Sequence, residues 1–390
     1  MTTLDQRPWC ASGFEPVATA FAENFDKRGE IGASFSAFVD GHPVVDLWGG
    51  IADPASQRPW ERDTLALGFS MTKGVTATCA NLLVERGQLD PHAPVASYWP
   101  EFAARGKQSI TVEQLLSHQA GLPVIEGNLS LDEALSWAPV VDQLASQTPL
   151  WEPGTAHGYH LRSFGWLAGE IVRRVSGMTL GTFLECEIAR PLELDLWVGL
   201  PEAFEPRLAT LIPPPQEFRD LLRSLPADMW LGRATTGPSG HFNYDESWNE
   251  RHLHACELPS SNGIGTARAF ARLYAGLVGT GVDGRRVLSA TTVQNAARER
   301  VRGADRILMR ETAFGLGYML PPTLAPAAGA RAFGHAGAGG SVAFADPERG
   351  LACCYLMNHM RFDPKGEPRA HALVQALYAC VDTINKREPQ

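Results

Sequence analysis

The chain has 390 residues, of which 44% are hydrophobic and 20% are charged, as is ordinary for a soluble globular protein. This length is enough for one large two-lobed unit or for two to three domains. The formal net charge of −9 argues against a surface for nucleic acid or an anionic membrane, because such surfaces need clustered lysine and arginine.

Apolar runs predict strands near both ends of the chain. Residues 31–39 and 43–48 are separated by Asp40-Gly41, a dipeptide typical of hairpin turns. A second strand-rich region lies near the C-terminus, and turn residues separate its last two runs. Its predicted strands are residues 332–334, 341–345 and 351–357.

The sequence between these strands is predicted to be helical. Residues 72–87 carry Val75, Cys79 and Leu82 at helical spacing and stop at Gly87. Further helices are expected over residues 111–117, 163–175, 180–189, 266–277 and 371–384. Since strands and helices do not alternate regularly, the pattern favours an α+β fold with a mainly antiparallel sheet assembled from both chain ends.

We expect one catalytic unit with two lobes. Residues 1–70 and 260–390 would form an α/β lobe, and residues 71–200 a helical lobe. Residues 201–259, which include six prolines between 201 and 226, are expected to form an irregular insertion. Such a long excursion is either a lid over the pocket or a packed surface segment.

The cellular compartment is predicted from what the sequence lacks. The polar N-terminus shows no signal-peptide pattern, and no stretch approaches the roughly 18 apolar residues of a membrane span. Seven cysteines without a Cys-x-x-Cys pair indicate reduced thiols. We therefore expect a cytoplasmic protein, and the oligomeric state is left open.

Two histidine pairs have spacings compatible with a metal site, His157 with His160 and His252 with His254. No His-Glu-x-x-His motif or carboxylate pattern accompanies them, so surface histidines with satisfied hydrogen bonds are expected. The sequence also lacks a Gly-x-Ser-x-Gly nucleophile elbow and a phosphate-binding P-loop. We expect no metal and no organic cofactor.

A Ser-x-x-Lys motif at Ser70 and Lys73 is the most informative feature. Residues three apart share a helix face, so the Lys73 amine can take the Ser70 proton and create a nucleophile without a histidine. A short apolar run ends at Ser70, which places its N–H at a helix N-terminus, facing developing negative charge. Burial would lower the pKa of Lys73 toward that of a usable base. The alternative is a capping serine beside a solvent-exposed lysine.

Two other segments could complete a hydrolytic site. Tyr159 precedes the helix predicted from residue 163, where its phenol could pass a proton to a leaving group; a packing tyrosine is the alternative. Residues 333–341 contain four glycines beside a strand. There an edge-strand N–H at Ala338 could hold an oxyanion together with the Ser70 N–H. The alternative is a glycine-rich hairpin turn.

The order of these motifs resembles the serine β-lactamase and penicillin-binding-protein-like superfamily, and within it the family VIII carboxylesterases. The resemblance covers nearly the whole chain. Besides the Ser70 motif, it rests on residues 45–50, 87–95, 115–122, 159–166, 191–192 and 334–337.

The resemblance implies a role for each matching residue. Ser70 matches the acylated serine, Lys73 its general base, and Tyr159 the tyrosine that assists proton transfer. His335-Ala336-Gly337 occupies the place of a Lys-Thr-Gly strand motif, and Ala338 the strand oxyanion position.

Two departures from the family pattern bear on the substrate. The Tyr-x-Asn motif reads Tyr159-His160-Leu161, and the third motif has lost its lysine. The loss of a cation and an amide favours an uncharged ester over an anionic antibiotic. We therefore predict a serine carboxylesterase for small, short-chain acyl esters. The candidate substrate-binding residues are His160, His335, Gly337, Trp230 and Trp248.

The same nucleophile would also suit a β-lactamase, a D-amino-acid peptidase or amidase, or an acyltransferase. A non-catalytic binding protein on this scaffold is a further alternative, although a degenerate site should have lost at least one of Ser70, Lys73 and Tyr159. The expected partner is a small-molecule ester, with no nucleic acid and no membrane.

Overall fold

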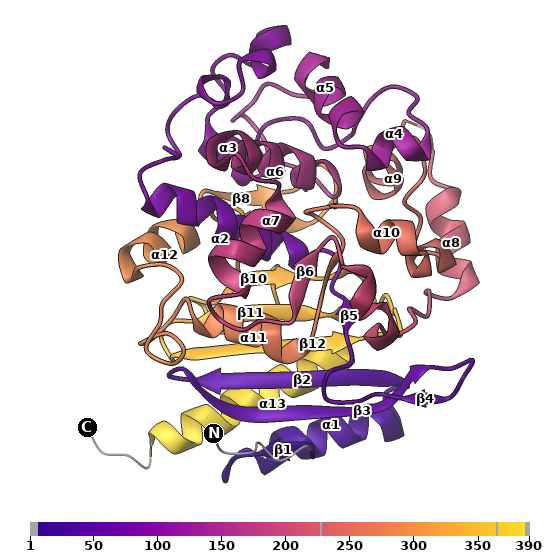
Figure 1. The fold of residues 1–390 in the computed structure, drawn as a ribbon, viewed down its shortest axis with the longest axis vertical. Coiled ribbons are helices and arrows are strands. Elements are labelled where there is room, and N and C mark those ends of the chain that lie inside the picture. The colour runs from indigo at the N-terminus through magenta and orange to yellow at the C-terminus, as the bar shows by residue number, and fades with distance from the viewer. Residues whose placement is uncertain (1–6, 227, 364–365, 387–390) are drawn as a thin grey trace.

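The other elements pack around a seven-stranded antiparallel sheet (Figure 1). The computed structural model describes residues 7–226, 228–363 and 366–386. Strands follow the order β1-β3-β2-β12-β11-β10, with β4 paired to β3. Their bounds are β1 Trp9–Cys10, β2 Gly32–Val39, β3 His42–Asp53, β4 Arg58–Pro59, β10 Phe333–Ala336, β11 Val342–Asp346 and β12 Leu351–Met357.

The centre of the sheet joins the two ends of the chain. β2 lies beside β12, where Phe35 is paired with Tyr355. Both strands are buried almost throughout, which explains their continuous apolar sequences. At the predicted hairpin, Asp40 and Gly41 both adopt positive φ, the conformation that a tight turn between twisted strands needs. The predicted α+β fold with an antiparallel sheet from both chain ends is confirmed.

Helices cover both faces of this sheet (Figure 1). On one face α1 (Glu15–Lys27) packs against α13 (Pro368–Asn385), and on the other α11 (Ala267–Ala275) contacts β2, β11 and β12. Helix α1 was not predicted from the sequence.

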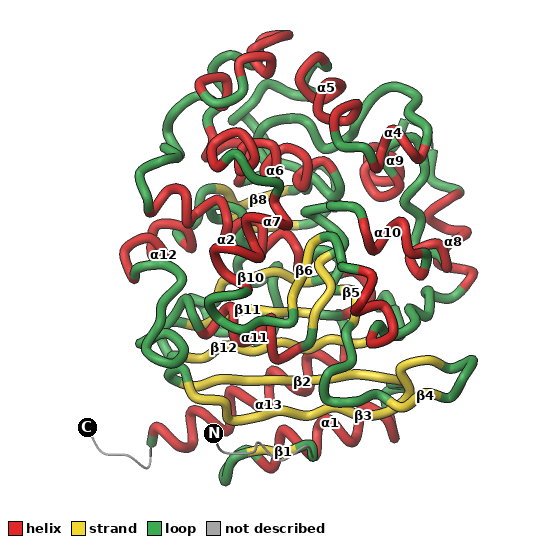
Figure 2. Tube along the Cα trace, viewed as in Figure 1, coloured by secondary structure: helices red, strands yellow, loops and turns green. Residues whose placement is uncertain are grey.

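Most other helices gather on the α11 side of the sheet, as Figure 2 shows. α2 is buried over nearly its whole length and contacts both α6 and β10, which brings the Ser70 end of α2 to the sheet. The predicted helices are present as α2 Met71–Glu85, α3 Val112–Leu116, α6 Ser163–Ser176, α7 Leu180–Leu184, α11 and α13, with ends shifted by a few residues. Three further helices were not predicted: α4 Leu131–Leu135, α5 Ala138–Ser146 and α12 Ala290–Ala297.

Residues 201–259 contain short helices where an irregular insertion was expected. The α-helices are α8 Gln216–Arg223, α9 Trp230–Thr236 and α10 Arg251–Ala255. Trp248 is fully buried in the same core as α2, and Trp230 packs against Trp151 with ring centroids 5.9 Å apart. Both tryptophans therefore serve packing within the fold.

Two small sheets complete the described structure. One has the order β5-β7-β6, and the other pairs β8 with β9. Their bounds are β5 Ala66–Leu67, β6 Leu196–Val198, β7 Gly263–Gly265, β8 Val301–Ala304 and β9 Glu311–Phe314. Within the described ranges, no helix has the length and apolar character needed to cross a membrane.

A glycine permits the close packing of α2. A Cβ atom at Gly74 would lie 2.0 Å from the Tyr274 hydroxyl of α11 and 3.5 Å from the His335 Cβ of β10. The Tyr274 hydroxyl is buried and has no hydrogen-bond partner among the described residues. Gly74 therefore sets how closely the nucleophile helix approaches its neighbours.

We expect Gly74→Ala to lower the free energy of unfolding by about 1–3 kcal/mol, because the added methyl group overlaps the Tyr274 hydroxyl. Tyr274→Phe removes an unpartnered hydroxyl and should be neutral or stabilising, so Gly74→Ala/Tyr274→Phe should regain most of the loss. Urea unfolding of the four proteins gives the double-mutant cycle. Additive losses in the double variant would contradict this packing argument.

Candidate active site

Three segments meet at one cleft. Ser70 begins α2, Tyr159 lies just before α6, and Gly337 and Ala338 follow β10. All four residues line a cleft of about 850 Å³. Its wall includes the apolar residues Leu161, Tyr244, Leu308, Met319, Leu324 and Val342.

The Lys73 amine is aimed at the Ser70 hydroxyl. Its Nζ is fully buried, donates to the Leu161 carbonyl (2.7 Å) and the Ser260 carbonyl (3.0 Å), and lies 3.1 Å from Ser70 Oγ. Carbonyl oxygens only accept, so they take two N–H bonds and leave one tetrahedral position facing Ser70. Burial, and secondarily the charge of Arg162, lower the pKa of Lys73 well below its ordinary value. When neutral, the amine presents its lone pair to the hydroxyl.

The backbone just before the nucleophile is strained. Phe69 has φ of 44°, in the left-handed region that costs a non-glycine residue about 1–2 kcal/mol. Its ring packs edge-on against Tyr244 and Trp248, with centroids 5.6 Å and 5.1 Å away. Trp248 thus helps to fix the turn into Ser70 from behind the cleft.

The Tyr159 phenol is held neutral beside the nucleophile. Burial raises its pKa well above the ordinary value, although a hydrogen bond with Ser70 acts in the opposite direction. Lys73 Nζ lies 4.9 Å from the Tyr159 ring centroid, and the phenol oxygen lies 3.5 Å from His335 Nε2. Tyr159 can therefore pass a proton while remaining a phenol.

His335 is a neutral imidazole. Its Nδ1 lies 2.7 Å from the Ala336 carbonyl, which can only accept, so the proton is on Nδ1 and Nε2 accepts from Tyr159. Burial is the main cause that lowers the pKa of His335 to about 3. The third motif therefore presents no cation to the site.

Two backbone N–H groups are available for an oxyanion. Among the described residues, neither the Ser70 N–H nor the Ala338 N–H donates a hydrogen bond, and both residues line the cleft. Ala338 lies in a 3₁₀ turn, Ala338–Gly340, rather than on the edge strand that was expected. The turn begins two residues after β10 ends, because the chain reverses there toward β11.

The structure identifies a buried aspartate that the sequence analysis missed. Both carboxylate oxygens of Asp305 accept the Tyr159 N–H, at 3.1 Å and 3.0 Å. The same carboxylate accepts from the N–H groups of Ile307 and Leu308 and from the Thr312 hydroxyl. Asp305 thus anchors the loop that carries the phenol, although no sequence motif marks it.

Arg162 is a second residue that was missed. Its buried guanidinium donates to the Thr235 and Phe242 carbonyls and to Ser261 Oγ, and lies 5.0 Å from the Trp248 ring. It joins the segment beside Lys73 to residues 235–261. A lone arginine next to the tyrosine motif carries no signal of this role in the sequence.

Only some of the predicted substrate-binding residues lie at the cleft. Gly337 lines the cleft, and His335 lies behind Tyr159. His160 is buried, with Nδ1 donating to the Gly158 carbonyl and Nε2 accepting the Leu122 N–H. Both its nitrogens are engaged by backbone. His160, Trp230 and Trp248 are not among the described residues that line the cleft.

The histidines that were expected on the surface are mostly buried. His157, His160 and His254 are each at most 3% exposed, whereas the His252 side chain is 42% exposed. Thr312 and Glu205 engage His157 and His254, respectively. In the ranges that the structure covers, no cluster of three His, Cys, Asp or Glu residues could hold a metal ion.

Comparison with known proteins gives matches that span most of the chain. The family profile described as Beta-lactamase matches residues 17–378. The chain is 37% identical over 358 residues to the esterase/beta-lactamase LipL of Mycobacterium tuberculosis, covering 89% of this chain and 81% of LipL. The matched segment contains every described residue that lines the cleft.

Solved structures agree with these matches. A family VIII carboxylesterase is 36% identical, with a TM-score of 0.88 and coverage of 97% of this chain and 100% of that chain. A penicillin-binding protein homolog from Caulobacter crescentus is 39% identical, with a TM-score of 0.85 and coverage of 95% and 98%.

We expect kcat/KM to rise with pH through a limb far below the ordinary lysine value, since only neutral Lys73 can accept the Ser70 proton. Activity should be lost as the pH falls below this pKa and be present above it. The measurement is kcat/KM of a p-nitrophenyl ester against pH, corrected for spontaneous hydrolysis.

Lys107 supplies the matched control for this profile. It is also buried and bonded to two carbonyls, and burial and Arg105 lower the pKa of Lys107 to about 8. It is not among the described residues that line the cleft. A limb that disappeared in Lys107→Met would overturn the assignment to Lys73.

We expect Asp305→Asn to lower kcat about 10- to 100-fold with a smaller change in KM, because the amide turns an N–H donor toward the Tyr159 N–H. Steady-state kinetics measures the effect. Asp46→Asn is the control, since buried Asp46 accepts from Ser36 and pairs with Arg268 outside the cleft lining. Equal losses in both variants would remove the positioning role of Asp305.

Proposed function

This chain belongs to the Beta-lactamase family and is a serine hydrolase, and we propose that it is a carboxylesterase for small, short-chain acyl esters. One observation carries the proposal. Two carbonyls hold the Lys73 amine so that its remaining position faces Ser70 Oγ at 3.1 Å. This geometry suits general-base activation of a serine for acyl transfer.

In the proposed acylation step, Ser70 Oγ attacks the ester carbonyl carbon while Lys73 Nζ takes its proton. The backbone N–H groups of Ser70 and Ala338 hold the oxyanion. Collapse of the tetrahedral intermediate breaks the bond to the alcohol oxygen. That oxygen receives the proton from Lys73 through the Tyr159 hydroxyl, which leaves the acyl group on Ser70.

Deacylation reverses these roles. Water loses a proton to Lys73, by way of Tyr159, and its oxygen attacks the acyl carbon. The second tetrahedral intermediate breaks the bond to Ser70 Oγ, which recovers the proton as the carboxylic acid departs. No step uses a group outside the chain other than ester and water.

The charge around the nucleophile supports an uncharged ester. His335 is neutral where the Lys-Thr-Gly motif of the family has its lysine, and Leu161 stands where the Tyr-x-Asn motif has its asparagine. Neither side chain offers charge to a carboxylate on the substrate. The esterase names of LipL and of the family VIII carboxylesterase are in keeping with this choice.

Cleavage of β-lactams is the second candidate, because LipL is named as both esterase and beta-lactamase. It needs the same attack by Ser70 on a strained amide. We also propose a reducing, cytoplasmic location, since all seven cysteines are free thiols.

Hydrolysis of p-nitrophenyl acetate, butyrate and octanoate tests the proposal. We expect turnover that favours the short chains and falls at least about 1,000-fold in Ser70→Ala, with a nearly complete loss in Lys73→Ala. Ser289→Ala is the matched control, because Ser289 caps α12 away from the cleft lining and should retain activity.

Other outcomes would redirect the assignment. Turnover that survived in Ser70→Ala would place the nucleophile elsewhere. Nitrocefin or D-alanyl amide turnover that exceeded ester turnover would favour the β-lactamase or amidase alternative. A wild type that neither turned over an ester nor reacted with a fluorophosphonate at Ser70 would indicate a binding protein.

A further inference from the structure

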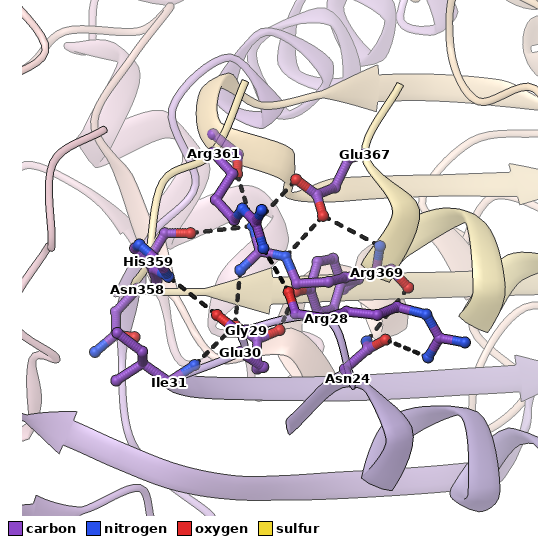
Figure 3. A network of polar contacts seen from close by, with 12 residues as sticks. Asn24, Arg28, Gly29, Glu30, Ile31, Asn358, His359, Arg361, Glu367 and Arg369 are labelled. Atoms are coloured by element: carbon purple, nitrogen blue, oxygen red, sulfur yellow. Dashed lines mark hydrogen bonds and ion pairs between the residues drawn. The ribbon is translucent and has the colours of Figure 1, made fainter. Parts of the chain in front are cut away.

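A buried guanidinium, that of Arg369, contacts the turn that carries Ala338. Figure 3 shows Arg369 together with its partners Glu30 and Glu367. Arg369, at the start of α13, is fully buried and pairs with Glu30 at 2.9 Å and Glu367 at 2.7 Å. Its Nη2 also donates to the Gly339 carbonyl at 3.2 Å and the His359 carbonyl at 3.1 Å. A charge at this depth is tolerated because acceptors surround it.

The Gly339 carbonyl connects this guanidinium to the next peptide group. It also accepts the Arg361 N–H at 3.0 Å. In a trans peptide the C=O and the following N–H lie in one plane and point in opposite directions. Fixing the Gly339 carbonyl therefore fixes the direction of the Gly340 N–H.

The Gly340 N–H acts in turn on the peptide that contains the oxyanion donor. It donates to the Gly337 carbonyl at 3.3 Å. That carbonyl shares its peptide plane with the Ala338 N–H, which points the opposite way. Two peptide planes thus link the Arg369 guanidinium to the Ala338 N–H.

The turn has few means of holding its own shape. Gly339 and Gly340 have φ of 84° and 123°, conformations that favour glycine. Neither residue has a side chain to pack. A Cβ atom at Gly339 would lie 2.8 Å from Met360 Cβ, and one at Gly340 would lie 2.8 Å from Glu367 Cγ. Apart from the backbone hydrogen bonds from Gly340 to Gly337 and from Gly337 to Ser341, external contacts therefore set the direction of the peptide groups.

The guanidinium is itself fixed from several sides. Glu30 is fully buried and accepts from Arg369 Nη1 and from the Tyr355 hydroxyl of β12. Glu367 accepts from Arg369 Nε and Nη2. The two carboxylates hold the planar fork in one orientation, which a point charge such as an ammonium would not reproduce.

We propose that Arg369 is a positioning residue that orients the Ala338 N–H of the oxyanion hole, with Glu30 and Glu367 holding its guanidinium in place. The inference rests on the proposed acyl-transfer function. Oxyanion donors act only when they point at the developing charge before it forms, so a change in their direction affects the transition state more than substrate binding.

The test compares an ester with its thionoester in wild type and in Arg369→Met. Sulfur is a weak hydrogen-bond acceptor, so the thionoester gains little from the oxyanion hole. We expect kcat for the ester to fall about 10- to 100-fold, with KM changed less than about threefold. The thionoester rate should change less than about threefold, so the ester-to-thionoester ratio should shrink. A merely structural defect would lower both rates equally and leave the ratio unchanged.

Companion variants keep the test decisive if Arg369→Met folds poorly. Glu30→Gln/Arg369→Met avoids leaving Glu30 as an unpaired buried charge and should show the same reduced ratio. Arg369→Lys keeps the positive charge but not the planar guanidinium, and it should restore only part of the wild-type ester-to-thionoester ratio. Glu170→Gln changes a buried carboxylate that Arg173 and Arg174 bind in α6, so it should lower stability without changing the ratio.

The rate of covalent labelling at Ser70 separates this inference from the proposed function. The rate at which a p-nitrophenyl phosphonate labels Ser70 depends on the oxyanion hole whether or not the protein turns over carboxylic esters. A wild type that is labelled but hydrolyses no ester would refute the esterase proposal alone. An unchanged labelling rate or an unchanged ester-to-thionoester ratio in well-folded Arg369 variants would overturn the role of Arg369.

Discussion

The burial of one lysine amine determines how the active site is built. Lys73 is held by carbonyls at Leu161 and Ser260, which are 88 and 187 residues away along the chain. Because a buried amine needs partners, α2, the loop before α6 and the segment before β7 must all converge on it. The cost of dehydrating the ammonium is also what makes the amine a base. Packing and chemistry at this point have the same physical origin.

Much of the fold was predictable because its signals are local. The Asp40-Gly41 turn, the apolar strands and the Ser70 to Lys73 spacing each depend on neighbouring residues. α1 was missed, and its N-cap, Phe14, makes no side-chain capping hydrogen bond. α4 and α12 were missed even though Ser130 and Ser289 cap them, so a capping residue by itself does not predict a helix.

Site residues were predictable only where they belong to a short sequence motif. Asp305 and Arg369 depend on contacts with Tyr159 and Glu30 that are 146 and 339 residues away in sequence, so no short pattern reveals them. His160 was proposed to bind substrate because it stands beside the tyrosine, but both its nitrogens bind backbone. Adjacency in sequence does not decide which way a side chain faces when the loop is buried.

The pairing of β2 with β12 has a consequence for biosynthesis. Proteins emerge from the ribosome N-terminus first, and β2 must wait for a partner that begins more than three hundred residues later, at Leu351. Until then its apolar edge depends on other protection against aggregation. The nascent chain therefore carries its nucleophile long before it has an oxyanion turn, and a polypeptide released early would be catalytically silent. The oxyanion turn at residues 338–340 and β12, which closes the central sheet, are therefore made one shortly after the other.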